Sequence, residues 1–151
     1  MINDIEMMNK KGLRITPQRL AVLDAVRELK SHPTAENVLD YIKSHHPNIA
    51  TGTVYKTLDT FVKKGIIKKV NTEKNIQRFD SVLEKHHHLY CSTTDRIEDY
   101  FDDELDKLIE RYFRNKKIPN FQISDINLQI FGKFVKHKNL ITNYKLKKNS
   151  K

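Results

Sequence analysis

Apolar residues recur every three or four positions through the first 65 residues of the chain. This spacing predicts a short helix over residues 2–9 and three longer helices that start near residues 17, 34 and 51. Thr16 can cap the second helix, Pro17 suits its first position, and Gly65 can close the fourth. The residues expected to face inward are Leu20, Leu23, Val26, Leu29, Val38, Leu39, Ile42, Val54, Leu58, Phe61 and Val62.

Two short apolar runs follow these helices, at residues 66–70 and 76–80, with a polar turn at 71–75 between them. Such a pattern predicts a β-hairpin. Three helices followed by a basic hairpin is the order of a winged helix-turn-helix, whose helix near residue 51 would enter the major groove of DNA. We therefore predict a DNA-binding domain over residues 1–80.

The second half of the chain predicts a small α/β domain over residues 86–136, which follows a polar connector at 81–85. Such a domain is too small to cover both faces of its sheet, so we expect a homodimer. The fold class is therefore α+β, a winged helix followed by a dimerisation domain. The expected elements are strands at 88–91 and 96–99, a helix at 102–116 and a strand-like segment over 121–135.

The helix expected at 102–116 should turn four apolar residues inward, and the last strand should alternate apolar with polar residues. The lysine-rich tail, residues 137–151, is expected to be frayed or to form a loose helix. The four inward helix residues and the three apolar strand residues are Leu105, Leu108, Ile109, Tyr112, Ile126, Leu128 and Ile130.

The chain is basic, with a net charge of +9 and a pI near 9.6. Residues 133–151 hold seven lysines and no acid, and residues 95–110 hold eight acids against two bases. Residues 1–80 still hold 14 Lys or Arg against nine Asp or Glu, so the N-terminal half is basic in its own right. Because such charges neutralise phosphates and release counterions, double-stranded DNA is the expected partner.

Composition also limits the class of protein. No apolar run approaches the roughly 20 residues that a membrane span needs. Residues 1–6 do not begin a secretory signal, since a basic region followed by an apolar stretch is missing. The single cysteine, Cys91, excludes an intramolecular disulfide and any zinc cluster made only of cysteines from one chain. We expect a cytoplasmic protein without membrane contact.

Three consecutive histidines lie at the start of the second half, and from spacing alone such a run is most often a solvated surface segment. On a strand, however, His86 and His88 would project from one face and could share a metal, while His87 would point away. Carboxylates and a further imidazole lie near in the pattern, at Asp80, Asp99 and His32. Nitrogen and oxygen donors of this kind suit borderline divalent metals. Cys91 is expected to be a buried strand residue rather than a ligand.

Several short motifs together resemble the ferric uptake regulator (Fur) family of bacterial metal-dependent repressors, over nearly the whole chain. The resemblance implies a winged helix, a C-terminal dimerisation domain and a regulatory metal where the two meet. The motifs, in order, are Arg14-Ile-Thr-Pro-Gln-Arg19, His32-Pro-Thr-Ala35, Thr53-Val-Tyr-Lys-Thr-Leu58, Arg78-Phe-Asp80, His86-His-His88-Leu-Tyr-Cys91 and the closing strand up to Gly132.

Within the family, the chain resembles the peroxide-sensing (PerR-like) branch, because Asp stands at positions 80 and 99 where the iron-responsive branch more often has Glu. The resemblance implies a regulatory site that holds Fe(II) or Mn(II), although Zn(II) or Cu(II) would bind at least as well in vitro. It also implies that His32 or His86 is oxidised when the Fe(II) form meets hydrogen peroxide. The implied metal ligands are His32, Asp80, His86, His88 and Asp99.

The chain departs from the family pattern at two other sites. Many members hold a structural Zn(II) with two Cys-x-x-Cys pairs, whereas here Cys91 is alone and Thr94 occupies the second position. We therefore predict no structural zinc and a C-terminal domain held by packing alone. A second His/acid site found in other members is incomplete, because Ile126 lies where its late histidine would be.

The polar side of the helix near residue 51 and the hairpin supply the expected DNA contacts. Tyr55 can offer an apolar face to a thymine methyl, and Lys56 can reach a base edge or a phosphate. Arg19 and the hairpin lysines are expected to contact phosphate. The full predicted set is Arg19, Thr53, Tyr55, Lys56, Thr57, Lys68, Lys69 and Lys74.

These observations favour a homodimeric transcriptional repressor, not an enzyme, that binds an AT-rich inverted repeat when loaded with metal and responds to hydrogen peroxide. An iron- or zinc-responsive uptake regulator of the same family is the first alternative. A small metalloenzyme, such as a mononuclear iron oxygenase, is another, but it leaves the basic N-terminal half unexplained. A DNA-coating protein without sequence preference is the third, and it predicts equal affinity for operator and random DNA at matched salt.

Overall fold

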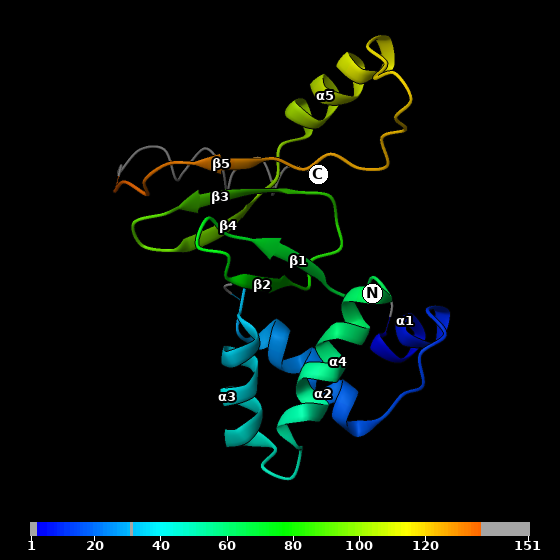
Figure 1. Cartoon of the computed structure of the whole chain (residues 1–151), viewed down its shortest axis with the longest axis vertical. Coiled ribbons are helices and arrows are strands. Elements are labelled where there is room, and N and C mark those ends of the chain that lie inside the picture. The colour runs from blue at the N-terminus through cyan, green and yellow to red at the C-terminus, as the bar shows by residue number, and fades with distance from the viewer. Residues whose placement is uncertain (1–2, 31, 137–151) are drawn as a thin grey trace, which may run out of the picture.

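A computed structural model describes residues 3–30 and 32–136, which form a helical lobe and a sheet-containing lobe with a β-hairpin between them (Figure 1). The predicted tail at 137–151 lies outside the described residues. None of the helices described is long and apolar enough to span a bilayer. The α+β class predicted from the sequence is confirmed.

The helical lobe holds four helices whose starts follow the predicted signals. The Thr16 hydroxyl accepts a hydrogen bond from the Arg19 amide, and Thr34 forms a capping box with Asn37. Gly65 adopts φ +66°, the left-handed conformation that commonly ends a helix. The helices are α1 (Asp4–Lys10), α2 (Pro17–Glu28), α3 (Ala35–His45) and α4 (Thr51–Lys63).

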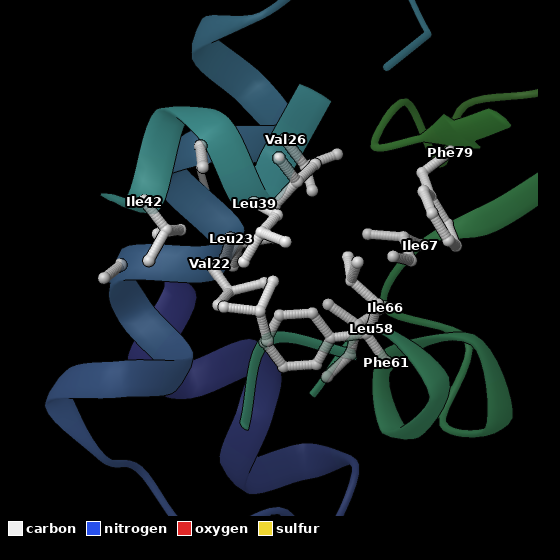
Figure 2. Packing of buried hydrophobic residues seen from close by; sticks show 14 of the residues in the cluster. Val22, Leu23, Val26, Leu39, Ile42, Leu58, Phe61, Ile66, Ile67 and Phe79 are labelled. Carbon is white, nitrogen blue, oxygen red and sulfur yellow. The ribbon is translucent and has the colours of Figure 1, made fainter. Parts of the chain in front are cut away.

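The main core lies among α2, α3 and α4, and nearly all of the predicted inward residues contribute to it (Figure 2). Phe61 of α4 is completely buried at its centre. Ile66 and Ile67 also point into this core, so they belong to the end of the helical lobe rather than to the predicted strand at 66–70. Phe79, from the hairpin, packs on the same cluster and thereby fixes the hairpin to the helices.

The hairpin consists of β1 (Lys68–Asn71) and β2 (Gln77–Asp80), an antiparallel pair in which Lys68 faces Asp80. The Phe79 amide donates to the carbonyl of Pro33 at 2.9 Å, just ahead of α3. The end of β2 is therefore held both by apolar packing and by the backbone of the segment that contains His32.

The second lobe has a three-stranded sheet of order β4–β3–β5, as drawn in Figure 1. Strands β3 (His87–Cys91) and β4 (Arg96–Tyr100) are antiparallel, and β5 (Gln129–Phe131) is parallel to β3. In this register His88 faces Asp99 across the sheet. Cys91 is buried in β3, as predicted, and a hydrogen bond to Thr94 lowers its pKa to about 7.

Two predictions for this lobe were wrong. No residue of the helix α5 (Asp103–Asn115) is fully buried: Leu105 and Ile109 are half-buried, whereas Leu108 is 60% and Tyr112 is 57% exposed, because no element among residues 3–30 and 32–136 covers that side of the helix. The strand-like segment predicted over 121–135 is limited to the three residues of β5.

Candidate metal centre

Five side chains converge where the end of the hairpin meets the sheet. Two come from the winged-helix side: His32 precedes α3, and Asp80 ends β2. Three come from the sheet side: His86 immediately precedes β3, His88 lies in β3, and Asp99 lies in β4. One donor atom from each of the five lies within 4.8 Å of the donor atoms of the other four.

The separations between donor atoms fit a single coordination sphere. The Nε2 atom of His86 lies 2.7 Å from Oδ2 of Asp80 and 3.1 Å from Nε2 of His88. The Nε2 atom of His32 lies 2.8 Å from Oδ1 of Asp99. Metal–ligand bonds of about 2.1 Å place neighbouring ligand atoms about 3 Å apart and opposite ones about 4 Å apart. The five donors therefore surround a point that a divalent ion can occupy.

The centre is buried and has unsatisfied polar atoms. Nε2 of His32 and Oδ1 of Asp99 are buried and face each other at 2.8 Å, but neither makes a hydrogen bond. His32 also has φ +53°, an uncommon conformation for a residue with a side chain. Buried polar groups without hydrogen bonds and backbone strain both cost free energy, and they concentrate at functional sites. A cation bound to these two atoms would satisfy both, so the residues present fit a metal.

Protonation states favour metal binding as well. Burial alone would raise the pKa of Asp80, but hydrogen bonds from His88 and from the Val82 amide, with the charges of His86 and His32, lower it below its ordinary value. Asp80 is therefore an anionic donor near neutral pH. The Nδ1 atom of His86 lies 2.7 Å from the carbonyl oxygen of Glu84, so Nδ1 carries the proton and Nε2 keeps its lone pair for a metal.

His87 is the histidine that the alternation sets apart from the other two, and it is completely buried. Its Nδ1 accepts a hydrogen bond from the Leu128 amide at 3.0 Å, so Nε2 carries the proton in the neutral ring. That Nε2 lies 3.2 Å from Oδ1 of Asp106 in α5, and Lys85 also pairs with Asp106. Sequence reasoning gave these residues no role, because no local pattern joins α5 to β3.

The predicted DNA contacts on α4 lie mostly on its exposed side. Tyr55 and Lys56 are exposed, and Thr53 is partly exposed. Thr57 is only 6% exposed, so the prediction that it lies away from the apolar stripe was wrong. It lies three residues after Val54 and four before Phe61, and the helical repeat therefore turns it inward.

The remaining predicted DNA contacts lie on the hairpin and α2. Lys68, Lys69 and Lys74 are exposed on the hairpin and its turn. Arg19 is partly exposed at the start of α2, where its guanidinium donates to the carbonyl of Arg14. All four leave positive charge where a phosphate can approach.

Comparison with known proteins connects this geometry to a family. Residues 10–131 match the model of the "Ferric uptake regulator family". The "Peroxide operon regulator" of Bacillus subtilis (strain 168) is 31% identical over 128 residues, which are 85% of this chain and 86% of that protein. The structure of the Campylobacter jejuni peroxide stress regulator superposes with a TM-score of 0.68 at 26% identity. The superposition includes 89% of this chain and 98% of that protein's chain. A zinc-bound manganese uptake regulator has a TM-score of 0.65 at 26% identity, over 85% of this chain and 96% of its own.

Proposed function

Because the chain belongs to the ferric uptake regulator family, we propose that it is a metal-dependent DNA-binding repressor that responds to hydrogen peroxide. Members of this family are metal-responsive transcription regulators rather than enzymes. The observation that carries the proposal is the buried set of nitrogen and oxygen donors drawn from both lobes. No thiolate is among them.

In the proposed mechanism, His32 and Asp80 on the winged-helix side and His86, His88 and Asp99 on the sheet side hold one divalent cation. A bound cation would supply positive charge that neutralises the two carboxylates in this buried site. Because its ligands come from both sides, these five residues would favour one relative orientation of residues 1–80 and 86–136, which the connector 81–85 joins. Only that orientation would space two recognition helices for an inverted repeat.

The donor set supports Fe(II) or Mn(II) as the regulatory metal, and cellular availability would exclude Zn(II), which this site could also bind in vitro. Bound Fe(II) would activate hydrogen peroxide, one oxygen atom of which would be inserted into an imidazole C–H bond while the other leaves as water. His32 and His86 are the proposed targets of oxidation. Both are buried next to the ion site, so an oxidant formed there would meet an imidazole before it met solvent.

The peroxide response rests on the likeness to peroxide regulators at about 30% identity. The second candidate is an iron- or zinc-responsive uptake regulator, and the likeness to a zinc-bound manganese uptake regulator favours a metal-uptake role of this kind. The two candidates share the metal-dependent orientation of the two lobes and differ in the signal that reverses it.

We also propose that the repressor is a homodimer. The apolar residues on α5 and β5 stay exposed in the single chain, among them Leu108, Tyr112, Ile130 and Phe131. Apolar area of this extent is typical of a surface that a second subunit covers. Dimerisation would also provide the two-fold symmetry that an inverted-repeat operator requires.

The proposed DNA surface combines α4 with the hairpin. Tyr55 and Lys56 would face base edges from α4, with Thr53 beside them. Hairpin lysines and Arg19 would contact phosphates and supply most of the salt-dependent affinity. The proposed contacts are Arg19, Thr53, Tyr55, Lys56, Lys68, Lys69 and Lys74.

A footprinting titration tests the metal switch. The protein is titrated on an AT-rich inverted-repeat duplex and on random DNA, once with Mn(II) and once with a chelator. We expect protection of the operator at much lower protein concentration with Mn(II). Equal affinity in the two conditions would remove the metal switch, and equal affinity for the two duplexes would favour the DNA-coating alternative.

Mass spectrometry separates peroxide sensing from plain metal sensing. The Fe(II)-loaded protein is exposed to hydrogen peroxide and its intact mass is measured, followed by peptide mapping. We expect the mass of one oxygen atom to be added at His32 or His86, and the Mn(II) form to stay unchanged. An unchanged mass of the Fe(II) form would count against oxidation and favour the metal-uptake alternative.

A further inference from the structure

Arg78 lies in β2 two residues before Asp80, and its guanidinium contacts two segments that are far apart in the sequence. Its Nη1 donates a hydrogen bond to the backbone carbonyl of His32 at 3.1 Å. Its Nη2 forms an ion pair with Oδ2 of Asp95, in the turn between β3 and β4. One side chain therefore joins the segment that carries His32 to the sheet that carries the other imidazoles.

Asp95 is itself held from the sheet side. Its Oδ1 accepts a hydrogen bond at 3.0 Å from the hydroxyl of Tyr90, a β3 residue that is only 1% exposed. Asp95 has φ +56°, so the turn fixes its backbone in the left-handed region. Tyr90, Asp95, Arg78 and His32 thus form a continuous polar chain across the junction of the lobes, and it uses none of the donor atoms in the candidate metal centre.

The contact with His32 is made where the backbone needs support. His32 has φ +53°, a conformation that persists only when the surroundings determine it. The next residues are pinned to the same strand: Pro33 accepts from the Phe79 amide, and Thr34 forms a β-bridge with Arg78. The hydrogen bond from Arg78 extends these backbone contacts with β2 to His32, the residue that carries the proposed metal ligand.

The pair of Arg78 and Asp95 is more sheltered than an ordinary surface ion pair, since the two side chains are 15% and 21% exposed. Burial alone would raise the pKa of Asp95, but its hydrogen bonds with Arg78 and Tyr90 lower it below the ordinary value. The carboxylate is charged at neutral pH, and a hydrogen bond between two charged groups is stronger than one between neutral groups.

We propose that Arg78 is a positioning residue for the metal centre, which favours docking of the His32 segment onto the β3–β4 turn through Asp95. This contact raises the fraction of metal-free chains in which the five donors already lie together, so less of the binding free energy of a cation is spent on ordering the protein. The inference rests on the proposed function only in requiring that the five donors bind a divalent ion.

The test measures Mn(II) affinity of the full chain, from the electron paramagnetic resonance signal of free Mn(II), for the wild-type chain, Arg78→Ala, Asp95→Asn and the double variant. Groups that support ligands from outside typically change metal affinity by about 10–100-fold when removed, so we expect each single variant to bind Mn(II) that much more weakly. The double variant should be no weaker than the weaker single one, because both changes break the same connection.

Arg96→Ala is the matched control. Arg96 lies next to Asp95 and forms an exposed ion pair with Glu98 within β4. Among the described residues it makes no hydrogen bond or ion pair with His32 or Asp95. Its removal should leave Mn(II) affinity unchanged. Arg78→Lys keeps the charge but cannot span both partners, so it should stay weakened. If Arg78→Lys bound Mn(II) as tightly as the wild-type chain, a positive charge at this position would be sufficient and the positioning role would be overturned.

Tyr90→Phe gives a second test if Arg78→Ala does not fold. It removes only the hydroxyl that orients Asp95, and we expect about fivefold weaker Mn(II) binding, the effect of one ordinary hydrogen bond. Thermal unfolding of the metal-free variants, measured in parallel, shows whether an affinity loss merely follows instability. Wild-type affinity in Asp95→Asn and Tyr90→Phe would overturn the inference and leave the proposed function intact. A wild-type chain that binds no Mn(II) would overturn both.

Discussion

Replacing Asp80 with asparagine tests which metal ligands make a cation prefer the docked arrangement of the two lobes. The three sheet-side donors lie on β3, on β4 or immediately before β3, so they stay together whether or not the lobes are docked. Only His32 and Asp80 join the other lobe to them. The preference of the cation for the docked form must therefore come from these two residues.

The size of the effect follows from population arithmetic. To turn a mostly undocked population into a mostly docked one, a cation must bind the docked form about 10⁴-fold more tightly. If His32 and Asp80 contribute equally, each supplies a factor of about 100. Asp80→Asn should therefore lower the ratio of docked to undocked chains at saturating Mn(II) by about 100-fold, from about 99:1 to about 1:1, so the gain in operator affinity caused by Mn(II) falls to about half that of the wild-type chain. Asparagine keeps an oxygen that can accept the Val82 amide, now at 2.8 Å, so the end of β2 stays capped.

The assay is fluorescence anisotropy of a labelled AT-rich inverted-repeat duplex, read as the ratio of dissociation constants in chelator and in saturating Mn(II). Glu84→Gln is the control, since it removes an exposed carboxylate two residues before His86 without touching the donor set. If Asp80→Asn still binds Mn(II) and gives the same ratio as the wild-type chain, Asp80 does not contribute to the preference of the cation for the docked form.

Three further predictions concern the lobes that carry the site. Phe61→Ala should lower the free energy of unfolding in urea by about 3–5 kcal/mol, because Phe61 is completely buried in the helical core. A loss below about 1 kcal/mol would contradict this burial. The pKa of Asp95 is lowered by Arg78 and Tyr90, so its contribution to stability is present above the ordinary value of 3.8 and is lost as pH falls below it. Asp95→Asn should thus flatten the loss of stability in acid, and an identical pH profile would contradict the ion pair. Lys56→Ala should weaken operator binding and reduce the salt slope by about 1 if Lys56 contacts a phosphate, whereas an unchanged slope with altered sequence preference would assign it to a base.

Local sequence signals predicted the helical lobe well because they act within a few residues. Thr16, Thr34 and Gly65 mark helix ends by hydrogen bonds and backbone conformation that need no distant partner. Thr57 shows where polarity misleads, since a hydroxyl residue occupies an inward position of α4 that periodicity alone would have assigned to the core.

The second lobe was less predictable because its contacts join distant segments. Leu108 and Tyr112 have the spacing of a buried face, but spacing does not reveal whether the covering surface belongs to the same chain. Asp99 reaches the candidate centre through the register in which it faces His88, a property of strand pairing. The pairing of Arg78 with Asp95 has no sequence signal at all, because it depends on how two hairpins meet.

His87 gives α5 a mechanical connection to the candidate centre. Its neighbours on either side are His86 and His88. Its own ring accepts a hydrogen bond from the Leu128 amide and lies 3.2 Å from the carboxylate of Asp106 in α5. A displacement of α5 would therefore shift the backbone between two imidazole donors. If a second copy covers α5, subunit association and cation affinity become linked quantities, and each changes the other by the same factor. If association strengthens cation binding, dilution of the protein would weaken that binding, and the operator would respond to protein abundance and metal supply through one equilibrium.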